Sequence, residues 1–170
     1  FREVASQSAQ PRRFTVAAKC RETGANEPPS ASQIITVVDT QTGATFAVGD
    51  SVAGELLQTY DDRYVVWSQF CNPCAPGQYG LHVRSLQDGK EQFVTDVYAP
   101  GIQPKLDGDW LVYAVITDEA ANAVMKTVQL RAFNLVTGEQ RIVAENAYVP
   151  LPGPSNRFAA GNGRVAWIGA

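Results

Sequence analysis

The stretch Asp107-Gly108-Asp109-Trp110-Leu111-Val112-Tyr113 decides the fold of this chain, because its pattern occurs three times in 170 residues. A polar turn comes first, apolar residues follow, and an aromatic residue ends the stretch. The other copies read DDRYVVW over residues 61–67 and GNGRVAW over residues 161–167. The final aromatic residues are 46 and 54 positions apart, and a period of this length indicates a repeat architecture.

A second pattern repeats in step with the first and centres on a glycine. Its copies cover residues 37–48, 83–94 and 132–143. In each copy a strand-like run leads into a short polar turn with Gly43, Gly89 or Gly138, and another strand-like run follows. Glycine readily adopts the positive φ that a tight hairpin turn requires. The pattern therefore predicts three β-hairpins, each with a glycine in its turn.

Short strands account for the rest of the repeated unit. Apolar runs are β-branched or aromatic and no 3.6-residue period persists, which predicts strands rather than helices. Residues 118–126 are expected to form a loop, and the prolines fall in connections, where they cost no central-strand hydrogen bond. The expected strands are 64–69, 81–86, 91–95, 110–116, 128–135 and 140–144, and the connecting prolines are Pro100, Pro104, Pro150, Pro152 and Pro154.

The beginning of the chain follows the unit less closely. Residues 14–20 and 34–39 are expected strands, joined by a polar loop over 21–32 that is rich in Pro, Gly and Ser. Residues 1–13 are expected to be a lead-in or an outer strand.

Two segments carry a resemblance to a known family. Residues 104–113 read Pro-x-Leu-x-Gly-Asp-x-Leu-Val-Tyr and residues 134–139 read Asn-Leu-x-Thr-Gly-Glu, which resembles the blade repeat of TolB-like and WD40-like β-propellers. The resemblance covers about residues 14–170 and implies blades of four antiparallel strands. The family's usual aspartate before the hairpin turn is kept at Asp39, whereas Ser85 and Asn134 stand near that place in the other copies.

The resemblance divides the chain into blades over about 14–60, 61–106 and 107–160, with the start of another over 161–170. Propellers typically have about 4–8 blades, and 170 residues at this period make three to four. We therefore expect an incomplete all-β propeller, completed by further sequence or by a second chain. A β-sandwich is the alternative, because strands and turns also alternate there.

Bulk composition excludes some partners. The formal net charge is −3 and the calculated pI about 5.1, which does not favour a nucleic-acid partner because such proteins present a basic face. No apolar run approaches the roughly 18 residues of a membrane-spanning helix, so no transmembrane segment is expected. A small-molecule ligand is left open, and no cofactor is expected.

Three cysteines favour a structural disulfide. Cys71 and Cys74 form a C-x-x-C pattern, but a zinc site needs about four ligands and only His82 is near in sequence. A redox motif would open a helix, and here Pro76 and Gly77 follow. We expect one disulfide among Cys20, Cys71 and Cys74, with the pairing open. A disulfide implies an extracytoplasmic compartment: periplasmic, secreted or cell-surface.

No catalytic or metal site is predicted. His82 is the only histidine, and no nucleophile elbow accompanies it. The pairs Asp61/Asp62 and Asp107/Asp109 lack the remaining oxygens of a calcium loop, and turn aspartates commonly bond their own backbone.

The aromatic residues divide into two groups. Trp67, Tyr113 and Trp167 recur with the repeat and are expected in the core. The residues outside this register are the candidate binding residues, Tyr79, Tyr98, Trp110 and Tyr148.

These features predict a non-catalytic, extracytoplasmic propeller that binds a protein partner or serves as a structural subunit. The long loops at 70–80 and 117–127 are the expected contacts, because loops carry function on a rigid scaffold. One alternative is the propeller of a larger prolyl-oligopeptidase-type hydrolase, where it would gate substrate access. Another is a lyase or sugar-processing propeller with Arg63 and Arg164 near its channel.

Overall fold

The computed structural model describes residues 12–20, 33–49, 54–70, 79–99, 102–117, 125–150 and 158–167. These residues are all-β, as the sequence predicts, and contain no helix that could span a membrane. The strands are β1 (Phe14–Cys20), β2 (Gln33–Asp39), β3 (Thr45–Val48), β4 (Gly54–Tyr60), β5 (Tyr64–Phe70), β6 (Gly80–Ser85), β7 (Glu91–Thr95), β8 (Lys105–Asp107), β9 (Trp110–Ile116), β10 (Met125–Asn134), β11 (Gln140–Pro150), β12 (Phe158–Gly161) and β13 (Arg164–Trp167).

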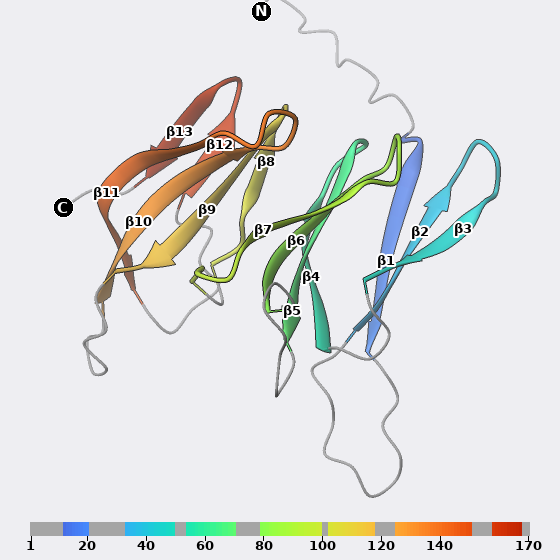
Figure 1. Ribbon diagram of the computed structural model, residues 1–170, viewed down its shortest axis with the longest axis horizontal. Coiled ribbons are helices and arrows are strands. Elements are labelled where there is room, and N and C mark those ends of the chain that lie inside the picture. Colours follow the sequence, from blue (N-terminus) through green and yellow to red (C-terminus); the bar gives the residue numbers. More distant parts are fainter. Residues whose placement is uncertain are drawn as a thin grey trace, which may run out of the picture.

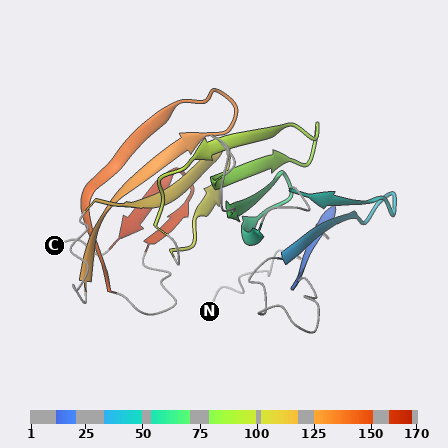
Figure 2. The same ribbon diagram turned by 60° about the horizontal axis from the view of Figure 1, so that its bottom comes forward.

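The strands form four separate antiparallel sheets. Each sheet pairs strands in chain order: β1–β3, β4–β7, β8–β11 and β12–β13. The first three sheets follow one another from right to left in Figure 1, and the turned view of Figure 2 shows the same succession. The two inner sheets, β4–β7 and β8–β11, each contain four strands.

The expected strands lie where the sequence placed them, with differences at some ends. Strands β1, β7 and β9 have the expected bounds, whereas β11 continues beyond 144 to Pro150. The boundaries expected at 61 and 107 fall at the turns that join β4 to β5 and β8 to β9. Each inner sheet thus begins one strand earlier than the aromatic-bearing strand, because the preceding strand, β4 or β8, pairs with it.

The three glycine turns share one geometry. Gly43, Gly89 and Gly138 have φ of 73°, 73° and 75°, and their N–H groups donate to the carbonyls of Asp39, Ser85 and Asn134 at 2.8–3.0 Å. The prediction that glycine supplies a positive φ is confirmed. The side chains at 39, 85 and 134 also accept N–H groups from the turn, so Ser and Asn replace Asp without loss of this bond.

Three apolar cores hold the sheets together. The first lies between β1–β3 and β4–β7, and includes Ile35, Val65 and Trp67. The second, with Val66 and Tyr113, lies between β4–β7 and β8–β11. The third lies between β8–β11 and β12–β13. Each inner sheet is therefore apolar on both faces, which explains the continuous apolar runs of β5 and β9.

Strand alternation assigns the two faces. In β5, Val65 and Trp67 face the preceding sheet while Tyr64 and Val66 face the following one. Trp67 and Tyr113 are buried, as the sequence predicts. The prediction is wrong for Trp167, which is exposed, because no strand beyond β13 covers it among the described residues.

The positive φ makes the turn glycines sensitive to substitution. We expect Gly138→Ala to lower the free energy of unfolding by about 1 kcal/mol, since a Cβ at positive φ is strained although open space surrounds it. The measurement is urea denaturation. Gly161→Ala is the matched control: it too has no atom within 4 Å, but its φ is not positive, so no loss is expected. Equal losses in both variants would contradict this explanation.

A buried carboxylate joins the start of β1 to the end of β2. Asp39 Oδ2 accepts hydrogen bonds from Arg13 Nη2 at 2.9 Å and Nε at 3.3 Å, and Oδ1 accepts the Gln41 N–H at 2.9 Å. The Arg13 hydrogen bond, with help from the Gln41 N–H, lowers the pKa of Asp39 from 3.8 to about 2. Because the folded pKa is below the unfolded one, the carboxylate stabilises the fold above about pH 4.

This stabilisation should disappear as the pH falls from about 4 to about 2. We expect Asp39→Asn to flatten the pH dependence of the unfolding free energy in that window and to be least stable relative to the natural chain at neutral pH. Denaturation curves at several pH values measure this. Asp62→Asn, at an exposed position, should leave the slope unchanged; an unchanged slope in the Asp39 variant would refute the assignment.

Candidate functional site

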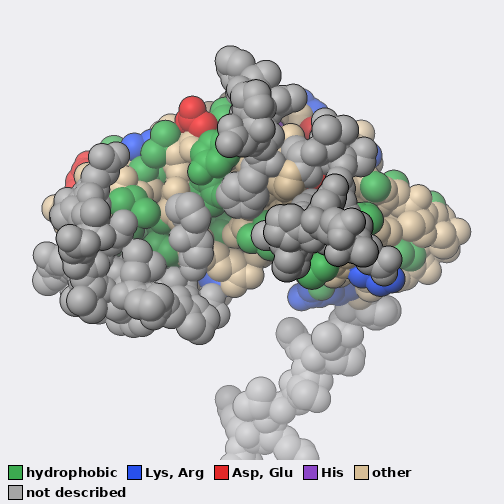
Figure 3. Space-filling view, turned by 90° about the horizontal axis from the view of Figure 1, so that it is seen from below, with side chains coloured by type: hydrophobic (Ala, Val, Ile, Leu, Met, Phe, Trp, Pro, Cys, Tyr) green, Lys and Arg blue, Asp and Glu red, His purple; other side chains and the backbone are tan. Residues whose placement is uncertain are grey.

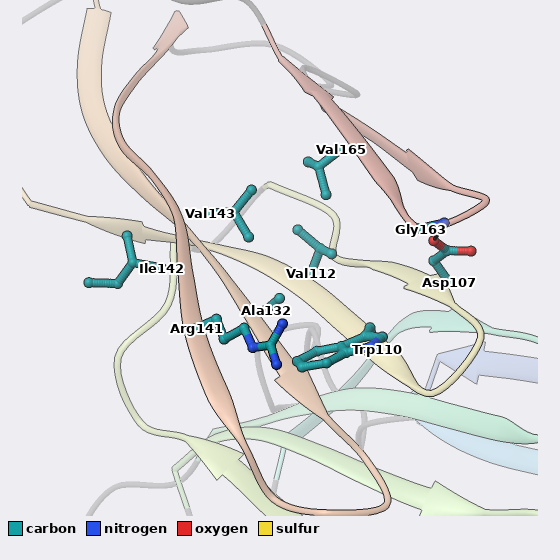
Figure 4. Close-up of a pocket in the computed structure, with 9 residues that line it drawn as sticks. All are labelled: Asp107, Trp110, Val112, Ala132, Arg141, Ile142, Val143, Gly163 and Val165. Carbon is teal, nitrogen blue, oxygen red and sulfur yellow. Dashed lines mark hydrogen bonds between the residues drawn. The ribbon is translucent and has the colours of Figure 1, made fainter.

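A pocket of about 320 Å³ lies between the β8–β11 and β12–β13 sheets. Figure 4 shows side chains from both sheets around it. We call it the Trp110 pocket; its lining residues are Asp107, Trp110, Val112, Ala132, Arg141, Ile142, Val143, Gly163 and Val165. Of the sequence-predicted binding residues whose side chains the structure describes, Trp110 alone contributes to it.

Hydrogen bonds between turns fix one end of this pocket. Asp107 Oδ2 accepts the N–H of Gly163 at 2.7 Å, which ties the β8–β9 turn to the β12–β13 turn. A similar tie joins the preceding pair of sheets, where Arg63 Nη1 lies 2.7 Å from Asp109 Oδ1. Both ties come from the repeated stretch that ends in an aromatic residue, so the repeat sets the spacing of the sheets as well as their pairing.

Arg141 and Trp110 form the polar side of the pocket. The Arg141 Cζ lies 5.0 Å from the centroid of the Trp110 ring, and its Nε donates to Glu139 Oε1 at 2.6 Å. The hydrogen bond to Glu139 raises the pKa of Arg141 above its ordinary value, so the guanidinium stays charged. The other walls include the apolar Val112, Val143 and Val165. In this pocket a cation lies over an aromatic ring and the walls are apolar. Such a site suits an aromatic side chain, or an apolar ligand that carries a negative charge.

Sequence reasoning missed Arg141, although the sequence carries a signal for it. It lies three residues after Gly138, as Gln92 lies three after Gly89 and Phe46 three after Gly43. Phe46 and Gln92 each contact the following sheet: Arg84 lies over the Phe46 ring, and Gln92 Nε2 donates to the Leu135 carbonyl. In the first two repeats this position therefore makes a contact between sheets, and in the third it lines the pocket between them.

Tyr79 and Tyr98, two other predicted binding residues, lie near each other. Tyr79 precedes β6 and Tyr98 follows β7, at the end of this sheet that is opposite the Gly89 turn. The rings of Tyr79 and Tyr98 have centroids 6.4 Å apart. Tyr79 is exposed, whereas Tyr98 packs in the core between the inner sheets and its pKa is raised by burial. At this end of the molecule, described hydrophobic side chains lie between the grey segments, with acidic and basic ones toward the margin (Figure 3).

A smaller pocket of about 220 Å³ lies beside β4. The β4–β5 register shifts between Leu57 and Thr59, which leaves a bulge at Gln58. The Gln58 carbonyl accepts the Gln103 side-chain amide at 2.7 Å, so the bulge bonds to the connection before β8. We interpret this pocket as part of the contact between sheets.

The remaining predicted residues form no reactive cluster in the described part of the chain. His82 lies between rings, with its centroid 5.5 Å from Trp67 and 5.4 Å from Phe93. Asp61 accepts the N–H groups of Arg63 and Tyr64 at 2.7 and 2.8 Å, which confirms the expectation that a turn aspartate bonds its own backbone. Within the described residues, no three His, Cys, Asp or Glu side chains gather as metal ligands would.

Several predicted residues lie outside what the structure describes. Cys71 and Cys74 are among them, as are most of the loops at 70–80 and 117–127. Cys20 is an exposed free thiol at the end of β1. Tyr148 lies in β11 opposite Thr127, and its side chain is outside the described part. Arg164 is exposed on β13.

Comparisons with protein-family models, curated proteins and solved structures found no match to this chain. The resemblance to TolB-like repeats therefore stays a prediction from the sequence.

The bond between Asp107 and Gly163 should control the mobility of the β12–β13 turn. We expect Asp107→Ala to speed amide exchange at Gly163 by about fivefold, because a charge-assisted hydrogen bond at an exposed site contributes roughly 1 kcal/mol. Hydrogen exchange followed by NMR measures this. In Asp62→Ala, Gly163 should exchange as in the natural chain; an unaltered rate in Asp107→Ala would show that the bond does not hold the turn.

Proposed function

We propose that this chain is part of a β-propeller that acts as a non-catalytic, extracytoplasmic subunit, either binding a protein partner or serving a structural role. The observation that carries the proposal is the repeated packing of sheet on sheet, in which each inner sheet buries both faces. Scaffolds of this kind place their binding residues at strand ends and loops rather than within strands.

Contacts between first strands support the propeller arrangement. Neighbouring sheets touch through β4 with β8 and through β8 with β12. In a propeller, the first strands of the blades surround a central channel, so these contacts are of the expected kind. A further chain or further propeller segment would then complete the ring.

The end of the molecule that carries Tyr79 is the proposed binding surface. Tyr79 is exposed, and its ring lies beside the buried ring of Tyr98, with 6.4 Å between the centroids. A tyrosine side chain has only two side-chain torsions, so it loses little conformational entropy on binding. The opposite end consists of the tight hairpin turns at Gly43, Gly89 and Gly138, which are short and regular.

Three cysteines in a chain of this size support the extracytoplasmic part of the proposal. A disulfide among Cys20, Cys71 and Cys74 would form in an oxidising compartment. The exposed thiol of Cys20 is accessible for such a bond.

The test compares substitutions at the Tyr79 end of the sheets with a substitution at the hairpin-turn end. The natural protein would be isolated under native conditions and its mass measured by light scattering. We expect a complex heavier than the free chain, and Tyr79→Ser should weaken it by about 30-fold, as loss of a central aromatic contact does. Val136→Ser, at an exposed residue of the hairpin-turn end, is the matched control and should not weaken it. A natural chain that runs only at its own mass would refute the proposal.

A further inference from the structure

The turn between β12 and β13 combines a reactive dipeptide with a special backbone conformation. Asn162 and Gly163 form the only Asn-Gly pair in the sequence. Their φ angles are 54° and 70°, and Gly161 pairs with Arg164 on either side of them. The two residues are therefore the central pair of a type I′ turn, for which Asn-Gly is a preferred sequence. Among the described residues, Asn162 is the one residue other than glycine with a positive φ.

An Asn-Gly pair can modify itself without an enzyme. The backbone nitrogen of the glycine attacks Cγ of the asparagine, and the absence of a Cβ on glycine leaves that approach open. The new N–C bond closes an imide ring, and the side-chain amide group leaves as ammonia with the proton from the glycine N–H. Water then opens the ring at either carbonyl, which gives aspartate or isoaspartate. In total, water is consumed, ammonia is released and a neutral side chain becomes a carboxylate.

The position of Asn162 in the repeat keeps it in contact with water. Asn162 is exposed, as are Asp62 and Gly108, which occupy the equivalent place in the other two copies of the repeated stretch. Exposure is thus a property of this turn position in every copy. Only the third copy carries an asparagine there, so only this turn offers a side-chain amide to a following glycine.

One hydrogen bond opposes the reaction. The Gly163 N–H donates to Asp107 Oδ2 at 2.7 Å, and Figure 4 shows the carboxylate beside Gly163 at one end of the Trp110 pocket. The nitrogen must give up this proton and turn toward Cγ of Asn162 before it can attack. A carboxylate next to the nitrogen disfavours the deprotonated amide, because like charges repel, and the bond also fixes the turn.

We propose that Asn162 is a site of deamidation, and that Asp107 slows the reaction by holding the N–H of Gly163. The bond that ties the β8–β9 turn to the β12–β13 turn then has a second role, since it protects a reactive dipeptide. This proposal rests on the turn alone and does not depend on the proposed function.

The products would weaken the same tie. Aspartate and isoaspartate both place a new negative charge one residue from the N–H that Asp107 binds. Isoaspartate also adds a methylene to the backbone of a two-residue turn, which no longer fits the type I′ geometry. Asp107 and Gly163 both line the Trp110 pocket, so modification should loosen the wall of the pocket that these two residues form.

The first experiment locates the modification. The natural chain is incubated at neutral and at mildly alkaline pH, and tryptic peptides from each time point are separated and weighed by mass spectrometry. We expect the peptide 158–164, Phe-Ala-Ala-Gly-Asn-Gly-Arg, to convert to aspartate and isoaspartate forms, faster at the higher pH. An acetylated synthetic peptide of the same sequence, free of the folded turn, should convert faster than the folded chain.

Asn134 is the internal control in the same digest, in peptide 132–141. A bulky Leu135 follows it, and its Oδ1 accepts the N–H groups of Val136 and Thr137 at 3.0 and 2.9 Å. We expect no conversion there. A folded chain unmodified at Asn162 after the synthetic peptide has converted completely would overturn the site. Equal rates in the folded chain and the synthetic peptide would overturn the protection.

The second experiment tests the role of the carboxylate. We expect Asp107→Ala to deamidate at Asn162 about fivefold faster than the natural chain, as the loss of one such hydrogen bond predicts. Amide exchange in β9 verifies that this variant is folded, and Asp62→Ala, at the equivalent exposed turn, should react at the natural rate. An unchanged rate in Asp107→Ala would overturn the protective role, and a slower one would show that the carboxylate acts as a base instead.

The third experiment tests the consequence for the turn. The modified chain carries an additional negative charge, so anion exchange separates it from the natural one. We expect the Gly163 amide to exchange faster in the modified fraction, because its bond to Asp107 is weakened. Exchange as slow as in the natural chain would contradict the loosening of the tie.

Discussion

The structure depends on burying both faces of each inner sheet. A four-stranded sheet with one apolar face needs one partner layer, but β4–β7 and β8–β11 are apolar on both sides and each needs two. The fixed alternation of side chains along a strand makes this possible, since Val65 and Val66 serve different neighbours. The stacking of sheets, the turns that tie them and the pocket beside the last sheet all follow from this requirement.

The ties between turns have a common origin in the repeated stretch. The acidic residue that opens the stretch satisfies its own turn in Asp61 and reaches the next turn in Asp107. One sequence pattern therefore closes a hairpin, aligns a sheet and sets the distance to a neighbour. Because these roles coincide in a few residues, local turn chemistry and long-range packing support the same arrangement.

The strands and hairpins could be predicted because they depend on neighbours in the sequence. Gly89 and Gly138 mark turns by their own conformational freedom, and β9 is readable from its apolar run. The pairing of β4 with β5 was not readable, since β4 has a bulge at Gln58 and mixed polarity. The Trp110 pocket was missed for a different reason: Arg141 and Val165 meet only when two sheets pack, and exposure of Trp167 depends on which strands lie beside it.

The face of β1–β3 that points away from the stack shows a contrasting composition. Where the inner sheets carry the rows Trp67–His82–Phe93 and Tyr113–Arg131–Ile142, this sheet carries Ala17, Thr36 and Ala47. This row is smaller than the rows of the inner sheets, whereas the exposed Ile34 lies on the same face, opposite Lys19. Among the described strands the main contacts between sheets join immediate neighbours, so a change in one interface needs no compensation two layers away. Substitutions in one interface can therefore accumulate without matching changes in the next.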